Sequence, residues 1–288
     1  MGTRAALAAW FEPRRSLYPW RGERDPYRVL VSEVMLQQTQ ATRVVPSYLV
    51  FVDRFPDLAS LAAATRRDVL LAWAGLGYNR RAVALHEAAR AVVERHGGAI
   101  PCEPPELEAL PGIGAYTAAA VASIAFGRPV PAIDTNVRRV VARARLGAEP
   151  HEVTASQVRD AAWSWLERAD PGGWNQAVMD LGRELCRPAP RCNACPLAGG
   201  CRFHVQGRHP SPHRRGSPPY QGSTRQARGR VVEQLLARES ATLGSLAATA
   251  GLPLDRMAKV VEGLVADGLV AAGPAALAGR ASGRVRLP

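Results

Sequence analysis

The segment Leu110-Pro-Gly-Ile-Gly114 decides the fold assignment, because it joins two stretches with helical patterns. Residues 105–110 before it and residues 115–126 after it are rich in helix-forming residues, and its two glycines permit a tight turn. The N-terminus of the following helix exposes N–H groups that suit one phosphate. Because the chain also carries a formal net charge of +12, we predict a helix-hairpin-helix element in which Gly112, Ile113 and Gly114 contact a DNA phosphate. The alternative is an ordinary turn between two helices.

The 288 residues around this segment indicate about two domains and a mainly α fold. Residues 1–206 show helical patterns with short connections and no clear alternating strand pattern. Residues 207–222 are rich in proline and glycine, which is typical of a linker. Residues 223–288 suggest three short helices followed by a hairpin, the order of a small winged-helix-like domain.

The charge balance favours a polyanionic partner. The chain has 37 basic and 25 acidic residues, a formal net charge of +12, and Lys259 as its single lysine. The hydrophobic content of 47% excludes a chain that is mainly disordered. Continuous apolar stretches are too short to span a membrane, and the N-terminal region lacks a signal-peptide pattern. We expect a cytoplasmic protein with no membrane association.

Glu33 lies on the apolar face of a helix that begins near Asp25 and Pro26. At 100° per residue its side chain falls among apolar positions such as Val29 and Leu36, so burial is expected to raise its pKa. A carboxylic acid that is partly protonated near neutral pH suits general-acid catalysis. The alternative is a structural glutamate paired with an arginine.

Asp134 lies at the start of another predicted helix, whose apolar stripe includes Val137 and Val140. The helix dipole and backbone N–H groups favour the ionised form of a carboxylate at this position. An N-cap role alone would also account for the residue. One protonated and one ionised carboxylate form the usual pair for cleaving a glycosidic bond through an oxocarbenium-like state.

Four cysteines occur in one short stretch with the spacing C-x5-C-x2-C-x5-C. They are Cys186, Cys192, Cys195 and Cys201. Four thiolates in a compact loop indicate a metal centre, and the spacing alone leaves an iron–sulfur cluster and a structural zinc ion both open.

In this order and spacing, these elements resemble the helix-hairpin-helix DNA glycosylase superfamily, and within it the MutY family of adenine DNA glycosylases. The resemblance extends from about Leu7 to Cys201. The matching runs are Leu17 to Trp20, Ser32 to Gln40, Gly75 to Tyr78, Leu110 to Gly114, Asp134 to Asn136 and Asn175 to Gly182. The run with Gln37, Gln38 and Thr39 is the most specific to the adenine enzymes.

The resemblance implies a base-excision-repair enzyme that acts on double-stranded DNA. It would flip out adenine mispaired with 8-oxoguanine or guanine and hydrolyse its N-glycosidic bond. Glu33 would protonate the adenine, and Asp134 would stabilise the sugar cation with support from Asn136 and Tyr116. The adenine pocket would be lined by Trp20, Arg21, Leu36 and Gln176. Gln38 and Tyr78 would fill the space in the duplex and contact the opposing base. The four cysteines would hold a [4Fe–4S] cluster, and the enzyme would be a monomer associated with the nucleoid when bound to DNA.

Two features depart from the family pattern. The first gap between cysteines is five residues where the family more often has six, and a Nudix-like C-terminal domain is not recognisable. Residues 223–288 could instead contact DNA through Arg225, Arg228 and Arg230, or serve only as a packing domain.

The residue types also bear on the reaction. Glycosylases that nick the backbone use a lysine amine as a Schiff-base nucleophile. Tyr116 occupies the position two residues after Gly114 where that lysine would lie, so we predict a monofunctional glycosylase. Two alternatives are a thymine or uracil glycosylase acting on G mismatches and a non-catalytic DNA-binding protein.

Overall fold

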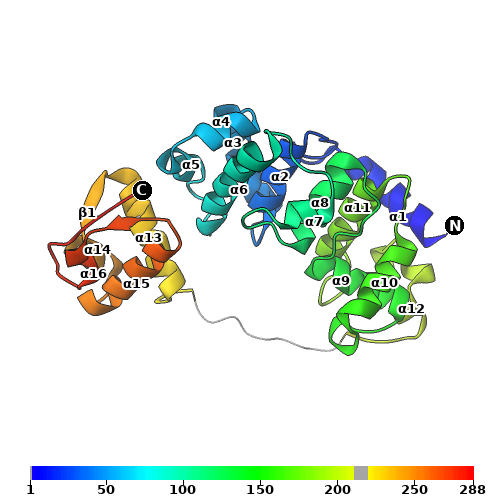
Figure 1. The fold of residues 1–288 in the computed structure, drawn as a ribbon. Coiled ribbons are helices and arrows are strands. Elements are labelled where there is room, and N and C mark those ends of the chain that lie inside the picture. Colours follow the sequence, from blue (N-terminus) through cyan, green and yellow to red (C-terminus); the bar gives the residue numbers. More distant parts are fainter. Residues whose placement is uncertain (1, 211–219) are drawn as a thin grey trace. The chain divides into compact units, whose positions relative to one another are not determined.

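The computed structural model of the chain describes residues 2–210 and 220–288, and Figure 1 labels their elements. The chain divides into two compact units. The first contains residues 2–34 and 100–210, and the second contains residues 35–99 and the C-terminal segment from residue 220. The predicted linker lies largely on residues 211–219, outside the described ranges, and the domain boundaries at 206 and 223 stay a prediction. Within the described ranges, no helix combines the length and the apolar character needed to cross a membrane.

The first unit is helical, and its described residues include no strand. This confirms the mainly α fold expected for residues 1–206. Its α-helices are α1 (Thr3–Phe11), α2 (Pro26–Leu36, whose last two residues belong to the second unit), α7 (Pro104–Glu108), α8 (Ala115–Phe126), α9 (Thr135–Val141), α10 (Ala155–Trp165), α11 (Pro171–Glu184) and α12 (Arg202–Val205).

Local sequence signals account for where the key helices begin. Asp25 accepts a hydrogen bond from the Tyr27 N–H at 2.9 Å, and Pro26 is the first residue of α2. Between α7 and α8 the chain turns at Gly112, whose φ of 71° lies in the left-handed region that glycine tolerates. The helix-hairpin-helix element predicted from Leu110 to Gly114 is therefore present.

The core of this unit forms where α11 packs against α8 and α9. Val137, Val140 and Val141 of α9 are completely or almost completely buried. A Cβ atom built on Gly182 of α11 would lie 2.7 Å from Cβ of Asn136, so only glycine allows α9 to approach so closely. This contact fixes the N-terminal turn of α9, where Asp134 and Asn136 lie.

Asn175 of α11 anchors the extended segment that leads into α9. Its side chain is fully buried and accepts a hydrogen bond from the Ala132 N–H at 2.8 Å. Its amide group donates to the Ser123 hydroxyl and to the Val130 carbonyl, each at 2.9 Å. Because these bonds satisfy buried backbone groups on the segment before Asp134, they hold that carboxylate in register.

The N-terminal part of the second unit contains four helices. They are α3 (Ala41–Arg54), α4 (Leu58–Ala63), α5 (Arg66–Ala72) and α6 (Arg80–His96). A loop after α2 leads into α3, and a loop with Gly75 and Gly77 leads into α6.

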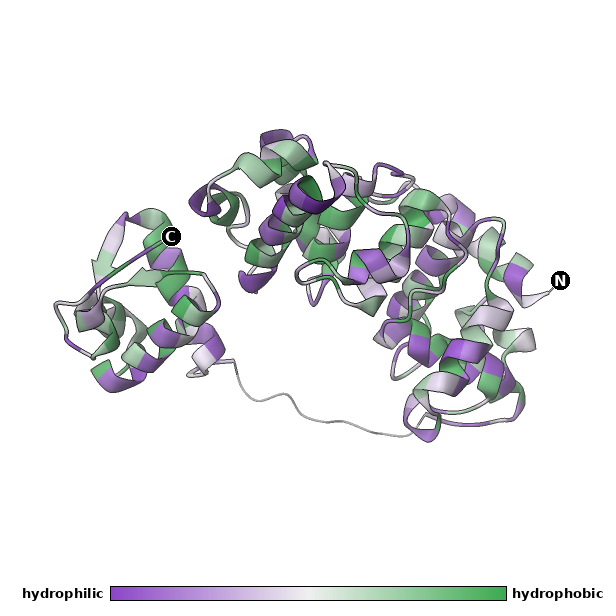
Figure 2. Ribbon diagram, in the orientation of Figure 1, coloured by the Kyte–Doolittle hydropathy of each residue, from purple (hydrophilic) through white to green (hydrophobic). Residues whose placement is uncertain are grey.

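The C-terminal part of this unit combines helices with a small antiparallel sheet. Its elements are α13 (Thr224–Ala237), β1 (Ser240–Thr242), α14 (Leu243–Ala250), α15 (Leu254–Ala266), β2 (Ala271–Ala272), α16 (Pro274–Leu277) and β3 (Arg284–Arg286). The strands form an antiparallel sheet in the order β1-β3-β2, with β3 in the centre. The three helices and the hairpin agree with expectation, whereas β1 and α16 escaped the sequence analysis because each is only three or four residues long. Figure 2 shows hydrophobic and hydrophilic residues alternating along α15, in keeping with its one buried face.

Candidate active site and cysteine loop

Glu33 lies on the buried face of α2, as its helical position predicts. The residue is 6% exposed, and burial raises the pKa of its carboxyl group. Tyr116, in the first turn of α8, donates a hydrogen bond from its hydroxyl to Oε2 of Glu33 at 2.8 Å. Burial and the neighbouring charge of Glu33 raise the pKa of Tyr116, so its hydroxyl stays protonated and acts as a hydrogen-bond donor. Glu33 is therefore a carboxylic acid that can carry a proton, and Tyr116 is a hydrogen-bond donor held beside it.

A buried ion pair lies close enough to Glu33 to influence it. Arg21 donates from Nη2 to Oδ1 of Asp180 at 2.7 Å, and both side chains are less than a tenth exposed. The charge of Arg21 lowers the pKa of Glu33, whereas the charges of Asp134 and Asp180 raise it, and burial outweighs these effects. Glu33, Arg21, Asp134 and Asp180 therefore form one electrostatic group.

Asp134 is the N-cap of α9. Its Oδ1 accepts from the Val137 N–H at 2.7 Å, and its Oδ2 accepts from Nδ2 of Asn136 at 2.8 Å. These donors and the N-terminal end of the helix surround the carboxylate with partial positive charge. The N-cap role and a catalytic role are compatible here, because the same contacts orient the carboxylate.

Asn136 is held in turn by Arg139 of the same helix. Arg139 donates from Nη2 to Oδ1 of Asn136 and to the Gly182 carbonyl, each at 2.8 Å, and from Nε to the Cys186 carbonyl at 2.6 Å. Desolvation lowers the pKa of Arg139. These bonds connect α9, the end of α11 and the first cysteine.

Three further predicted side chains lie in this part of the chain or at the end of α2. Trp20 is 3% exposed and stacks on Tyr18 with ring centroids 5.2 Å apart. Gln176 is 7% exposed on α11, and Leu36 is half-buried at the last position of α2.

The predicted duplex-contacting residues lie on two loops of the second unit. Gln38 and Tyr78 have φ angles of 55° and 48°, the only positive values among the described non-glycine residues. Such backbone strain is often found at functional positions. Both side chains are exposed, and that of Tyr78 is 43% exposed.

Arg81 of α6 joins these two loops. Its guanidinium donates to the carbonyls of Gln37 and Gly77 at 2.6 and 3.2 Å and to the Thr39 hydroxyl at 3.1 Å. Burial lowers the pKa of Arg81 to about 10. Gln37 and Thr39 thus contribute to the shape of the loop that presents Gln38.

In the hairpin, Gly112 and Gly114 are exposed, and Gly114 is the N-cap of α8. Ile113 differs from its neighbours, because its side chain is 5% exposed and its N–H donates to the Leu110 carbonyl at 3.2 Å. A phosphate contact at this turn would therefore use the free N–H groups of the first turn of α8 rather than the Ile113 side chain.

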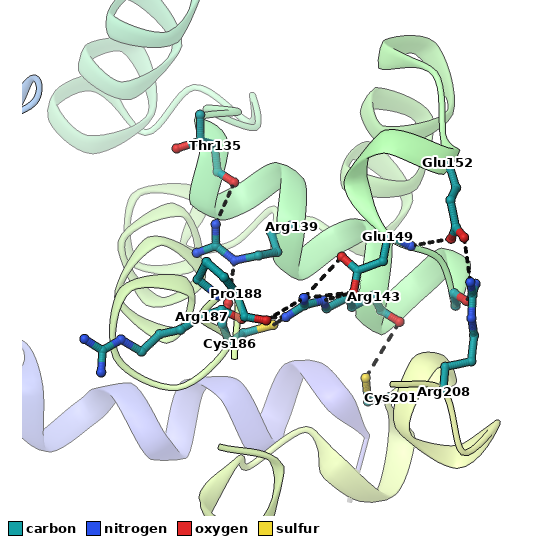
Figure 3. Close-up of polar contacts among 11 residues, drawn as sticks. Thr135, Arg139, Arg143, Glu149, Glu152, Cys186, Arg187, Pro188, Cys201 and Arg208 are labelled. Carbon is teal, nitrogen blue, oxygen red and sulfur yellow. Dashed lines mark hydrogen bonds and ion pairs between the residues drawn. The ribbon is translucent and has the colours of Figure 1, made fainter. Parts of the chain in front are cut away.

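The four cysteines line one cavity, which Arg143 and Phe203 also border. Arg143 comes from the π-helical turn η2 (Ala142–Leu146) and donates to the Arg187 carbonyl at 2.6 Å and to the Pro188 carbonyl at 3.2 Å (Figure 3). Burial raises the pKa of Cys195 to about 11. Among the described residues, no three His, Cys, Asp or Glu side chains are grouped closely enough to hold a single metal ion. All-sulfur donors around a shared cavity fit a metal–sulfur group.

Sequence reasoning missed Arg81, Asp180 and Arg143. Each is a charged residue inside a helix or helical turn, where a solvent-exposed face is the ordinary interpretation. A signal was available for Asp180 alone, since it falls within the matching run from Asn175 to Gly182.

Chemically, the first unit presents a buried acid, a second carboxylate at a helix N-terminus and a cysteine-lined cavity. Two carboxyl groups in different environments are what hydrolysis of a glycosidic bond requires. Residues 31–168 match the family model described as HhH-GPD superfamily base excision DNA repair protein.

Curated relatives extend this match. The adenine DNA glycosylase of Mycobacterium tuberculosis is 40% identical over 272 residues, covering 92% of this chain and 88% of the relative. The adenine DNA glycosylase of Mycolicibacterium smegmatis is 38% identical and covers 95% of each chain. The human adenine DNA glycosylase is 42% identical over 211 residues, and this chain spans 39% of its length.

Solved structures share the fold. A thermostable thymine-DNA glycosylase superposes with a TM-score of 0.65 at 27% identity, covering 70% of this chain and 95% of the other. Endonuclease III, trapped as a covalent intermediate with DNA, superposes with a TM-score of 0.60 at 22% identity, covering 71% and 94%. From the two carboxyl groups, the hairpin and these relatives together, we conclude that the chain belongs to the adenine DNA glycosylase family of helix-hairpin-helix base-excision-repair enzymes.

Proposed function

We propose that this protein removes adenine mispaired with 8-oxoguanine or guanine from double-stranded DNA by hydrolysing its N-glycosidic bond. The observation that carries the proposal is the pairing of Glu33, buried with a raised pKa beside Tyr116, with Asp134 at the start of α9. The activity named for the mycobacterial and human relatives supports adenine as the base.

Glu33 is the general acid in this proposal. Protonation of the adenine ring turns it into a better leaving group, and a carboxyl group whose pKa is raised carries a proton nearer neutral pH. The Tyr116 hydroxyl orients the carboxyl group through its 2.8 Å hydrogen bond. After the bond breaks, the same carboxylate accepts a proton from the attacking water.

Asp134 stabilises the positive charge that develops on the sugar. The bonds from Val137 and Asn136 hold its carboxylate in one orientation, so little reorganisation is needed when that charge appears. Asn136 and Tyr116 act as positioning residues for the two carboxyl groups.

The base must leave the helical stack before these groups reach it. We assign the adenine pocket to Trp20, Arg21, Leu36 and Gln176. Gln38 and Tyr78 occupy the space that the base vacates and contact its former partner, and the two loops that Arg81 joins present them. Gly112, Ile113 and Gly114 form the turn that directs the first N–H groups of α8 toward a DNA phosphate.

We infer that the reaction stops at an abasic site. Tyr116 stands where a lyase carries its lysine, and the single lysine of the chain, Lys259, lies on α15. The phenol of Tyr116 has no amine nitrogen with which to form a Schiff base.

We propose that the cysteine loop holds a [4Fe–4S] cluster on Cys186, Cys192, Cys195 and Cys201. The four cysteines share one cavity and offer four sulfur donors, the ligand set that such a cluster uses. The cluster would supply structural cross-linking of the loop, since hydrolysis transfers no electrons. We further expect a monomer that works in the cytoplasm on nucleoid DNA.

Single-turnover assays on duplexes with A opposite 8-oxoguanine, A opposite G, T opposite G and U opposite G test the proposal. We expect strand cleavage only at mispaired adenine and only after alkali. Cleavage at T or U would assign the chain to the thymine or uracil branch, and cleavage without alkali would contradict a monofunctional reaction.

Variants separate catalysis from binding. Glu33→Gln and Asp134→Asn should each lower the excision rate by about 10²–10⁴-fold while affinity for mismatched duplex is retained. Glu108→Gln, at an exposed position of α7, serves as the matched control and should behave as wild type. Full activity in Glu33→Gln would overturn the assignment of the acid.

A further inference from the structure

The C-terminal part of the chain has a winged-helix arrangement, in which a helix or a strand hairpin can contact nucleic acid. The helix that would serve in the usual way is α15. Its exposed charges are Asp255, Arg256, Lys259 and Glu262, two of each sign, so the helix presents no net positive field. A DNA backbone gains little from such a surface.

The sheet differs from α15 in its charge. Arg284 and Arg286 are exposed on β3, while Val285 between them is fully buried, so both arginines lie on the solvent face of the central strand. Their cross-strand neighbours on this face are Ser240 and Thr242 of β1 and Ala271 of β2. We call this surface, defined by Ser240, Thr242, Arg284 and Arg286, the arginine face.

No acidic side chain of the described residues forms an ion pair with either arginine of this face. Arg284 donates to the Ser240 hydroxyl at 3.2 Å, a bond that leaves most of its guanidinium available. Two arginines at alternate positions of a strand are roughly 6.6 Å apart along it, and each can bind a phosphate bidentately.

The three arginines named from the sequence are less suited to this role. Arg228 forms an ion pair with Asp267, Arg225 lies over the Tyr220 ring at 5.0 Å, and Arg230 donates to the Ala250 carbonyl at 3.3 Å. Their contacts within the module hold them in place, whereas no carboxylate of the described residues pairs with the arginine face.

We propose that the arginine face binds the phosphate backbone of duplex DNA and so adds a second, sequence-independent contact outside the catalytic unit. The partner is a polyanion that is recognised by its charge, because the face offers guanidinium groups beside small neutral side chains. α15 does not enter the major groove in this mode of binding.

The test measures the dissociation constant of the full chain for a fully paired duplex as salt is raised. Such a duplex carries no excisable base, so the result does not depend on the proposed adenine removal. The double variant Arg284→Ala/Arg286→Ala should make the salt slope shallower by about 1.8, or about 0.9 for each lost phosphate contact. Between roughly 50 and 200 mM salt, wild type should then lose about 12-fold more affinity than the variant.

Arg256→Ala/Lys259→Ala on α15 is the matched control, because it removes the same two charges from the same module. We expect its slope to stay close to that of wild type. An equal change of the salt slope in both double variants would mean that only the net charge of the chain matters, and it would overturn the proposal. An unchanged salt slope in Arg284→Ala/Arg286→Ala would also overturn it.

A conservative variant guards against a folding defect. Arg284→Lys/Arg286→Lys keeps both charges and should keep the salt slope, so a slope lost in this variant would mean that the arginines act structurally. Binding of wild type to anionic phospholipid vesicles that the alanine variant loses, with no change in DNA affinity, would assign the face to a membrane surface and also overturn the proposal.

Discussion

Replacing Arg143 by methionine should destabilise the protein strongly, because this arginine is a buried cation that holds the cysteine loop. Its side chain is 3% exposed, and its partner Glu149 is 7% exposed. Nη2 of Arg143 donates to both carboxylate oxygens of Glu149, at 2.9 and 3.2 Å, and Nε adds a bond at 3.2 Å (Figure 3). Nη1 donates to the Arg187 carbonyl, and Nη2 also contacts the Pro188 carbonyl.

The magnitude follows from what the substitution leaves behind. Removing one partner of a buried ion pair leaves the other charge without a partner in a medium of low polarity. This lowers the free energy of unfolding by about 3–5 kcal/mol. Arg208→Ala is the matched control, because Arg208 pairs with Glu152 at 2.7 Å but both side chains are 37% exposed. Exposed pairs contribute about 0–1 kcal/mol. The two substitutions should therefore differ by roughly 3 kcal/mol.

Urea denaturation of the two variants and wild type, analysed with a shared m-value, measures this difference. Arg143→Met should also lower the iron bound per chain, since two loop carbonyls lose their donor. The double variant Arg143→Met/Glu149→Leu should recover much of the loss because it removes the stranded carboxylate. A loss below about 1 kcal/mol in Arg143→Met, or no recovery in the double variant, would refute this reasoning.

Three further outcomes follow from the active site and its support. The hydrogen bond from Tyr116 lowers the pKa of Glu33, so Tyr116→Phe should raise that pKa and move the alkaline limb of the single-turnover rate to higher pH; a shift to lower pH would contradict the contact. Because burial raises the pKa of Glu33 above its unfolded value, stability should fall as pH rises from the ordinary glutamate range through the raised value. Glu33→Gln should accordingly increase Tm above that window, with no gain below it in pH-dependent melting curves. Asn175→Ala should cost about 1–3 kcal/mol because it leaves the buried Ala132 N–H without its acceptor, and it should slow excision; wild-type stability in urea would show that this bond is dispensable.

Local patterns in the sequence were sufficient to predict several elements. The hairpin at Leu110 to Gly114, the helix beginning at Pro26 and the apolar stripe of α9 depend on short-range rules, namely glycine conformations, capping and helical periodicity. For the same reason Glu33 could be placed on a buried face and Asp134 at a helix start. The cysteine spacing indicated a metal centre but left zinc and iron open, because ligand spacing does not report how far the sulfur atoms stand from one another.

Only the tertiary structure decided which charged residues act together. Arg21 and Asp180 are 159 residues apart and meet beside Glu33, and Tyr116 reaches the same carboxyl group across 83 residues. The roles of Arg81, Arg143 and the arginine face likewise depend on long-range contacts or on strand register. A helical or exposed pattern in the sequence gives no information about either. The physical reason is that periodicity specifies which face of an element is buried, whereas the partner of a buried charge depends on how elements distant in sequence pack together.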